Sequence, residues 1–301
     1  SSRFVETEGG EPVVRLSNVS EFRPGDVIER IDGLPAAEAS ARLLELRASS
    51  ASSAARNGLS AFLAVPGTRD YVLRGVDGER RDVSVSAADL TTEVPLFPSR
   101  AWGPLDDLGH PELIYVDLAA AATEGSTAAV GIAMFAAEGI VFDMRGYPGP
   151  NSWRLARAVL NEGSPGPEIR RVYRSPLERW QERYPQPSPP AQTPYPGRVA
   201  ILTGPTTQSQ AEHLVLTLQA ANRVTVVGRP SAGANGNITS IALPGGYAQA
   251  FTGMIILQPD DSVFHGVGVR VDEAVPIEAA DLAAGVDPEL ERAIAVLAGG
   301  G

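Results

Sequence analysis

One segment of the chain places a serine between an expected strand and an expected helix: Ile201-Leu-Thr-Gly-Pro-Thr-Thr-Gln-Ser-Gln-Ala-Glu-His-Leu214. The apolar run ends at Gly204-Pro205, and the pattern that follows predicts a helix from about Ser209 to Ala221. The free amide N–H groups at a helix N-terminus can stabilise the oxyanion of an acyl-transfer reaction. A serine at this position is therefore a candidate nucleophile.

The same serine has a structural alternative. Ser209-Gln-Ala-Glu212 fits a capping box, in which the serine caps the helix and the glutamate reaches back to the serine amide. Taken alone, this spacing favours the capping role, so the surrounding sequence has to decide between the two.

The base that would activate Ser209 cannot be a lysine, because all 25 basic residues of the chain are arginine. A serine nucleophile needs an adjacent base. The three histidines, His110, His213 and His265, and the carboxylates are the remaining candidates.

Three groups of motifs, in order, resemble the C-terminal processing peptidase family, which comprises the tail-specific proteases and their tricorn-like relatives. Gly139-Ile-Val-Phe-Asp-Met-Arg-Gly-Tyr-Pro-Gly149 is similar to the family's strand followed by D-x-R-x-N-x-G-G. Thr207-Gln-Ser-Gln-Ala-Glu212 is similar to its T-x-S-x-x-E nucleophile segment. Val226 to Gly233, Leu243 to Gly246 and Gly266 to Val269 are similar to its closing hairpins. The resemblance covers about residues 113 to 297.

The resemblance implies a serine peptidase with an oxyanion hole made by two backbone amides. One belongs to Gly149, with Gly146 as the alternative, and the other to Gln210. Two residues depart from the family's turn, because Tyr147 replaces an asparagine and Pro150 replaces a glycine. The resemblance also implies that the family's lysine would stand at residue 234, where this chain has alanine.

Among the histidines, His265 is the first candidate for the base, because tricorn-like members place a catalytic glutamate in that register. His110 is the second, since it precedes an expected strand near the position of the tricorn-like catalytic histidine. His213 is the third, because its position in the helix is usually apolar in the family, so packing explains it. Glu212 is the expected orienting carboxylate, bound to turn amides or to the base.

Composition agrees with this family and excludes several classes of partner. The net charge of −11 argues against nucleic acid and anionic membranes, and no apolar run is long enough to span a membrane. We expect a polypeptide substrate, no cofactor and no metal. Because the chain begins at Ser1, we expect an N-terminal segment to have been removed. The family resemblance implies a periplasmic or secreted location.

The N-terminal region, expected over residues 1–90, contains Phe22-Arg-Pro-Gly-Asp-Val-Ile-Glu-Arg-Ile-Asp-Gly-Leu-Pro35, which resembles the R-P-G-D-V-I-x-x-I-D-G core of PDZ domains. A helix from Ala36 to Leu46 and a hairpin around Asp77-Gly78 are expected to follow. PDZ domains bind a chain terminus by adding it as a strand. No clear carboxylate-binding loop precedes Val13, so packing against the catalytic domain is an equal alternative.

After a linker over residues 91–112, we expect the peptidase core over residues 113–301. Strands at 113–118 and 140–143 alternate with helices at 128–137 and 153–160, which predicts an α/β (mixed α+β) fold. The resemblance implies a ClpP/crotonase-like core with a mixed sheet and packed helices. Asp143 and Arg145 are expected to be structural.

Residues 164–197 form a segment rich in proline and arginine, which we expect to be largely irregular, with one helical turn around Leu177 to Glu182. It is either a surface loop or a lid whose Tyr173, Trp180 and Tyr184 contact substrate.

Two functions follow from these observations. The first is a serine peptidase that hydrolyses extended or C-terminal polypeptide segments without a lysine base. The second is a degenerate peptidase fold that binds peptides or small ligands. Ser209, Glu212 and a histidine in the catalytic register favour the first, whereas the missing lysine and the altered turn favour the second.

Overall fold

The computed structural model divides the chain into two units, the first comprising residues 1–100 and 274–292 and the second residues 101–273 and 293–301. It describes residues 2–6, 11–44, 67–86, 100–120, 124–172, 181–185 and 193–299. The predicted boundaries differ from these units, because residues 274–292 make their contacts within the first unit rather than within the peptidase core.

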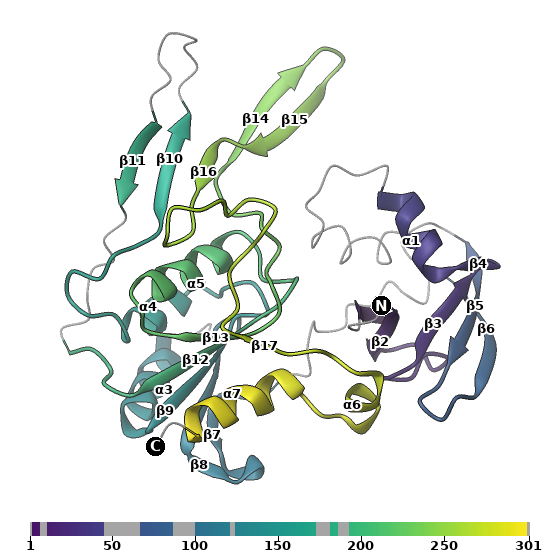
Figure 1. Cartoon of the computed structure of the whole chain (residues 1–301), viewed down its shortest axis with the longest axis horizontal. Coiled ribbons are helices and arrows are strands. Elements are labelled where there is room, and N and C mark those ends of the chain that lie inside the picture. Colours follow the sequence, from purple (N-terminus) through teal and green to yellow (C-terminus); the bar gives the residue numbers. More distant parts are fainter. Residues whose placement is uncertain are drawn as a thin grey trace. The chain divides into compact units, whose positions relative to one another are not determined.

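The first unit contains an antiparallel sheet in the order β1-β2-β3-β5-β6, with β4 paired to β3 (Figure 1). Its elements are β1 (Ser2–Glu6), β2 (Pro12–Ser17), β3 (Val27–Ile31), β4 (Leu34–Pro35), α1 (Ala36–Leu44), β5 (Thr68–Arg74), β6 (Arg80–Ser86) and α6 (Ala279–Ala284). Apolar residues of β3 and β5 form its core, with Ile28, Ile31, Tyr71 and Leu73 fully buried. Tyr71 and Leu73 alternate along β5, whereas the register of β3 shifts between Ile28 and Arg30. The predicted strand at 27–31 and the hairpin around Asp77-Gly78 are present.

Strand β2 is paired on both sides, with β1 on one edge and β3 on the other. Both edges of β2 are therefore occupied by strands of the same chain.

The second unit is built on a sheet in the order β17-β13-β12-β9-β8-β7, in which β8, β9, β12 and β13 are parallel. These strands have nearly continuous apolar cores, as expected for parallel strands covered on both faces. The unit is the mixed α/β fold predicted from the sequence. Its elements are β7 (Gly103–Leu105), the 3₁₀ helix η2 (Asp106–Leu108), β8 (His110–Asp117), α3 (Glu124–Ala136), β9 (Gly139–Asp143), α4 (Ser152–Arg157), β10 (Glu168–Val172), β11 (Gln181–Pro185), β12 (Arg198–Thr203), α5 (Gln210–Ala220), β13 (Thr225–Gly228), β14 (Ile238–Leu243), β15 (Tyr247–Thr252), β16 (Met254–Ile256) and β17 (Glu273–Ala274). The last helix, α7 (Pro288–Ala298), contains the final boundary between the two units.

Helices α3, α4 and α5 pack into one apolar cluster with the central strands. Met134 of α3, Leu155 of α4 and Leu214 of α5 are buried there beside Phe142 and Ile201. Of the helices that the structure describes, none is long and apolar enough to cross a membrane.

The proline-rich segment contains two strands rather than only irregular chain. β10 pairs antiparallel with β11 on one side and with β16 on the other. Residues 181 and 182, expected at the end of a helical turn, belong to β11, while Tyr173 and Trp180 lie outside the described residues. Pairing of β10 with β16 makes part of this segment a strand. The proline content of the sequence alone does not reveal that a distant strand is available for pairing.

Candidate active site

The candidate site lies where the parallel strands end. Asp117 of β8 is paired with Asp143 of β9, and Asp143 is paired with Leu202 of β12, so the three residues form one row across the sheet. The chain leaves β12 at Thr203, and α5 begins at Gln210. Ligand sites in open α/β sheets form at the carboxyl ends of strands, and this edge carries the predicted nucleophile.

Ser209 is the residue that precedes α5, and its backbone is strained. Its φ is 57° and its ψ is −116°, whereas an ordinary N-cap residue has extended dihedral angles. In the described part of the chain the other non-glycine residues with positive φ are Asp32, Asn222 and Asp261, types that tolerate this region better than serine. Such strain costs about 1–3 kcal/mol and concentrates at functional sites.

The predicted capping box is present, and its glutamate does more than cap the helix. The fully buried Glu212 accepts a hydrogen bond from the Ser209 N–H at 2.8 Å. It also accepts the Ser231 hydroxyl at 2.6 Å, the Gly233 N–H at 2.6 Å and the Ala234 N–H at 3.1 Å. Burial raises the pKa of Glu212, while these hydrogen bonds oppose the shift. The carboxyl group therefore fixes the strained serine to residues 231–234, and turn amides surround it.

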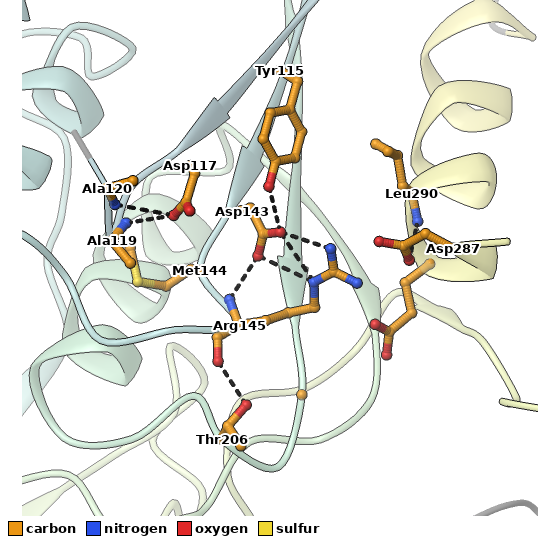
Figure 2. A network of polar contacts seen from close by, with 12 residues as sticks. Tyr115, Asp117, Ala119, Ala120, Asp143, Met144, Arg145, Thr206, Asp287 and Leu290 are labelled. Atoms are coloured by element: carbon orange, nitrogen blue, oxygen red, sulfur yellow. Dashed lines mark hydrogen bonds and ion pairs between the residues drawn. The ribbon is translucent and has the colours of Figure 1, made fainter. Parts of the chain in front are cut away.

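The turn before Ser209 is anchored on the end of β9. Thr207 Oγ1 donates to the Met144 carbonyl at 2.9 Å and accepts the Gly204 N–H at 3.0 Å. Thr206 Oγ1 donates to the Arg145 carbonyl at 2.6 Å (Figure 2). The two threonines thus hold the segment before Ser209 against the glycine-containing turn that follows β9.

Asp143 and Arg145 are structural, as their positions predict. Asp143 accepts the Arg145 backbone N–H at 2.9 Å and the Arg145 Nη2 at 2.7 Å, and both side chains are buried (Figure 2). The Tyr115 hydroxyl donates to Asp143 Oδ2 at 2.8 Å. Burial is the main cause of the raised pKa of Tyr115, and the Asp143 charge adds to it. This network sets the direction in which the chain leaves β9.

We expect Asp143→Ala to destabilise the protein by about 3 kcal/mol, because it removes the carboxylate from a buried ion pair with Arg145. Tyr115→Phe removes only one hydrogen bond and should cost about 1 kcal/mol. Chemical denaturation of the two variants measures the difference. Equal, small effects would contradict the structural role of the pair.

Three amides were predicted as oxyanion donors, and their present partners differ. Gln210 is the first residue of α5, so no carbonyl within the helix can accept its N–H. Gly146 follows Arg145 at the Thr206 contact, and its N–H has no acceptor among the described residues. The Gly149 N–H donates to the Leu118 carbonyl at 3.0 Å. The Gln210 and Gly146 amides are therefore available, whereas the Gly149 amide is engaged.

His265 lies on the outer edge of β16. Its Nε2 accepts the Ile256 N–H at 3.0 Å, and its ring also hydrogen-bonds the Met254 backbone. Burial lowers the pKa of His265, and the Met254 contact partly opposes this shift. The next residue, Gly266, donates its N–H to the Gly233 carbonyl at 3.0 Å. Through Gly233, the turn that carries His265 is joined to Glu212 and so to the start of α5.

His213 lies one helical turn after Ser209, on the same side of α5. Its ring lies 5.9 Å from that of Trp153, and its Nδ1 is 3.4 Å from Asn235 Nδ2. Burial lowers the pKa of His213. The contact with Trp153 agrees with the packing role inferred from the sequence.

His110 begins β8, and its Nδ1 is 3.0 Å from Glu112 Oε1. Ser209 follows the carboxyl end of β12, and β8 runs in the same direction as β12, because both are parallel to β9. The eight residues of β8 span roughly 25 Å. The structure therefore places His110 at the amino ends of the parallel strands, whereas Ser209 lies at their carboxyl ends.

Sequence reasoning missed two polar residues beside the site. Ser231 links Glu212 to the turn that follows His265, because its hydroxyl also accepts the Val269 N–H at 2.7 Å. Asp117 ends β8 as Asp143 ends β9, and its Oδ1 accepts the Ala119 and Ala120 amides at 2.7 and 3.3 Å (Figure 2). Burial, followed by the Asp143 charge, raises the pKa of Asp117. The sequence signal for Asp117 is an aspartate at the end of an apolar strand, the same pattern that identified Asp143.

Comparisons with known proteins place the geometry in context. The sequence model of peptidase family S41 matches residues 114–275, more than half of the chain. Mature CPAF complexed with lactacystin is similar in fold, with a TM-score of 0.69 and 15% sequence identity over 98% of this chain and 81% of that chain. A peptidase candidate from Parabacteroides merdae has a TM-score of 0.54 and 23% identity, covering 65% of this chain and 63% of that chain. A search of curated proteins finds no match.

Proposed function

Because this chain belongs to peptidase family S41 and is a serine-type peptidase that acts on polypeptides, we propose that Ser209 is its nucleophile. The observation that carries the proposal is the strained backbone of Ser209 at the mouth of α5. A residue that serves only as a cap gains nothing from positive φ, whereas a nucleophile is presented by a sharp strand-to-helix turn.

In the proposed reaction, the Ser209 hydroxyl oxygen attacks the scissile carbonyl carbon and its proton passes to a histidine. The Gln210 amide and a glycine amide of the 146–149 turn stabilise the resulting oxyanion. Of these glycines, Gly146 needs no rearrangement, whereas Gly149 must first release the Leu118 carbonyl. The protonated histidine then gives its proton to the leaving amine, and water hydrolyses the acyl-enzyme.

We propose His265 as the base, because its turn is hydrogen-bonded to the Gly233 that Glu212 binds. In the free protein, Nε2 accepts the Ile256 N–H, and the ring also hydrogen-bonds the Met254 backbone. The ring must therefore leave Ile256 before it can accept a proton from Ser209. Catalytic hydrogen bonds that form only with bound substrate are common in peptidases. His213 is the alternative because it lies nearest to Ser209 along α5.

The direct test is labelling of the intact protein with a fluorophosphonate, followed by mass spectrometry of its peptides. We expect one adduct, on Ser209, because only an activated serine reacts with this reagent. Heat-denatured protein is the control and should remain unlabelled. An adduct on another serine would reject Ser209 as nucleophile, and peptide binding without any adduct would support the degenerate binding protein.

We further propose that the PDZ-like sheet of the first unit receives the C-terminus of a polypeptide once β1 leaves β2. The supporting observation is the pairing of β1 on the edge that a peptide would use. Removal of residues 1–10 should strengthen binding of a labelled C-terminal peptide, measured by fluorescence anisotropy, and amidation of that peptide's C-terminus should weaken it. Unchanged affinity after truncation would reject this role. We also propose an extracytoplasmic location, which rests on the family resemblance alone.

A further inference from the structure

The hairpin formed by β14 and β15 carries an unusual set of exposed side chains. Opposite residues of an antiparallel pair share one face, and faces alternate along each strand. The register pairs Thr239 with Phe251, Ile241 with Gln249, and Leu243 with Tyr247. One face, which we call the apolar face, therefore holds Thr239, Ile241, Leu243, Tyr247, Gln249 and Phe251.

The large side chains of this face are open to solvent. Ile241 is 40% exposed, Leu243 42%, Tyr247 73% and Phe251 46%. The opposite face holds four small residues, Ser240, Ala242, Ala248 and Ala250, together with Ile238 and Thr252 at the base of the hairpin. Exposed apolar clusters of this kind mark binding surfaces more often than isolated apolar residues do.

The hairpin also lacks the charges that normally protect an exposed strand. From Pro230 to Pro259 the sequence contains no charged residue, although 20% of the chain is charged. Natural edge strands usually carry charges that prevent pairing with other chains. The hairpin is a two-stranded sheet of its own (Figure 1), and such a ribbon is at best marginally stable in water without a partner.

Both ends of the hairpin are joined to the candidate active site. Before β14, the Ala234 N–H donates to Glu212 and Asn235 Nδ2 is 3.4 Å from His213 Nδ1. After β15, the chain passes through Gly253 into β16, whose Ile256 N–H binds His265. The Gly253 N–H donates to the Asn237 carbonyl at 3.1 Å and closes the base of the hairpin. The apolar face is thus continuous in sequence with the loops that hold Glu212 and His265.

We propose that the apolar face of the β14–β15 hairpin binds an extended, apolar segment of the substrate polypeptide and leads it to Ser209. This inference rests on the proposed function and names its substrate class: unfolded chains with exposed apolar residues. Each six-residue strand is roughly 20 Å long, enough for about six substrate residues. The uncharged surface fits an apolar segment because neither side has to desolvate a charge.

The test uses the Ser209→Ala protein, so that binding is measured without turnover. The probe is a fluorescein-labelled peptide of about twelve residues, long enough to reach beyond one strand, in which leucine alternates with threonine. Its control has serine in place of every leucine. By anisotropy, we expect the leucine peptide to bind at least about tenfold more tightly than the serine peptide, since several apolar side chains are buried.

Two double variants separate the apolar face from the hairpin as a whole. Ile241→Glu with Phe251→Glu places charges on the apolar face and should lower the affinity for the leucine peptide by about tenfold or more. Ser240→Glu with Ala248→Glu places the same charges on the opposite face and should leave affinity unchanged. In the otherwise wild-type protein, neither pair should alter hydrolysis of a short chromogenic peptide that occupies only the active site.

Three results would overturn the proposal. Equal affinities of the two double variants would show that the apolar face does not bind the peptide. Loss of short-peptide hydrolysis in the apolar-face variant, with peptide affinity unchanged, would assign the hairpin to positioning the active site. Light scattering that finds a dimer, converted to monomer only by the apolar-face variant, would make a second copy of the chain the occupant. If the wild-type protein hydrolysed no peptide while the leucine peptide bound as expected, the proposed catalytic role of Ser209 would be wrong, whereas the binding role of the apolar face would be supported.

Discussion

Ser209→Ala should lower peptide hydrolysis by about 10⁴-fold or more, because removal of a nucleophile leaves only binding and oxyanion stabilisation. This loss corresponds to about 5.5 kcal/mol of activation free energy. Stability should change by only about 1 kcal/mol, the usual contribution of a helix cap. Initial rates with a chromogenic peptide, together with chemical denaturation, measure both effects on the same protein.

A matched variant separates the chemistry from the strain. Ser209→Gly is equally inactive in our proposal, but glycine adopts positive φ without steric cost. It should therefore be more stable than Ser209→Ala by about 1 kcal/mol, since alanine keeps the Cβ that makes this backbone unfavourable. Retained turnover in either variant would show that Ser209 is not the nucleophile. Equal stability of the two variants would show that the positive φ of residue 209 carries no energetic cost.

His265→Gln should lower kcat/KM by roughly 10²–10⁴-fold, the usual effect of losing a general base. The glutamine amide can still accept the Ile256 N–H and donate to the Met254 backbone, so the edge of β16 stays covered. His213→Leu is the matched control, because leucine keeps the packing against Trp153. We expect that variant, and His110→Ala, to retain most of the activity. The reverse result for His265 and His213 would assign the base to His213.

The pH dependence follows from the same histidine. Only neutral imidazole accepts the serine proton, and burial lowers the pKa of His265. The kcat/KM of the wild-type protein should therefore rise with pH through an apparent pKa below the ordinary histidine value of about 6.5, and be constant near neutral pH. A rise centred well above pH 7 would exclude both His265 and His213 as the base, because partial burial lowers the pKa of His213 as well.

The sequence by itself determined the elements that lie close to Ser209 along the chain. The apolar run before Gly204, the capping-box spacing of Ser209 and Glu212, and the aspartate at the end of β9 all depend on contacts within a few residues. Local patterns of this kind are fixed by strand and helix geometry. For the same reason, the hairpin at Asp77-Gly78 was predictable from its turn residues.

Only the tertiary structure decided how distant segments meet. His110 lies at the amino end of β8, far from Ser209. The Gly149 amide donates to the Leu118 carbonyl, and His265 accepts the Ile256 N–H on the outer edge of β16. These outcomes depend on strand order and register, and the same local sequence is compatible with many such arrangements. The positive φ of Ser209 likewise occurs beside the hydrogen bonds that join Glu212 to residues 231–234, which are close in space and distant along the chain. Side-chain types therefore indicated the chemistry, and long-range backbone pairing decided which groups can take part in it.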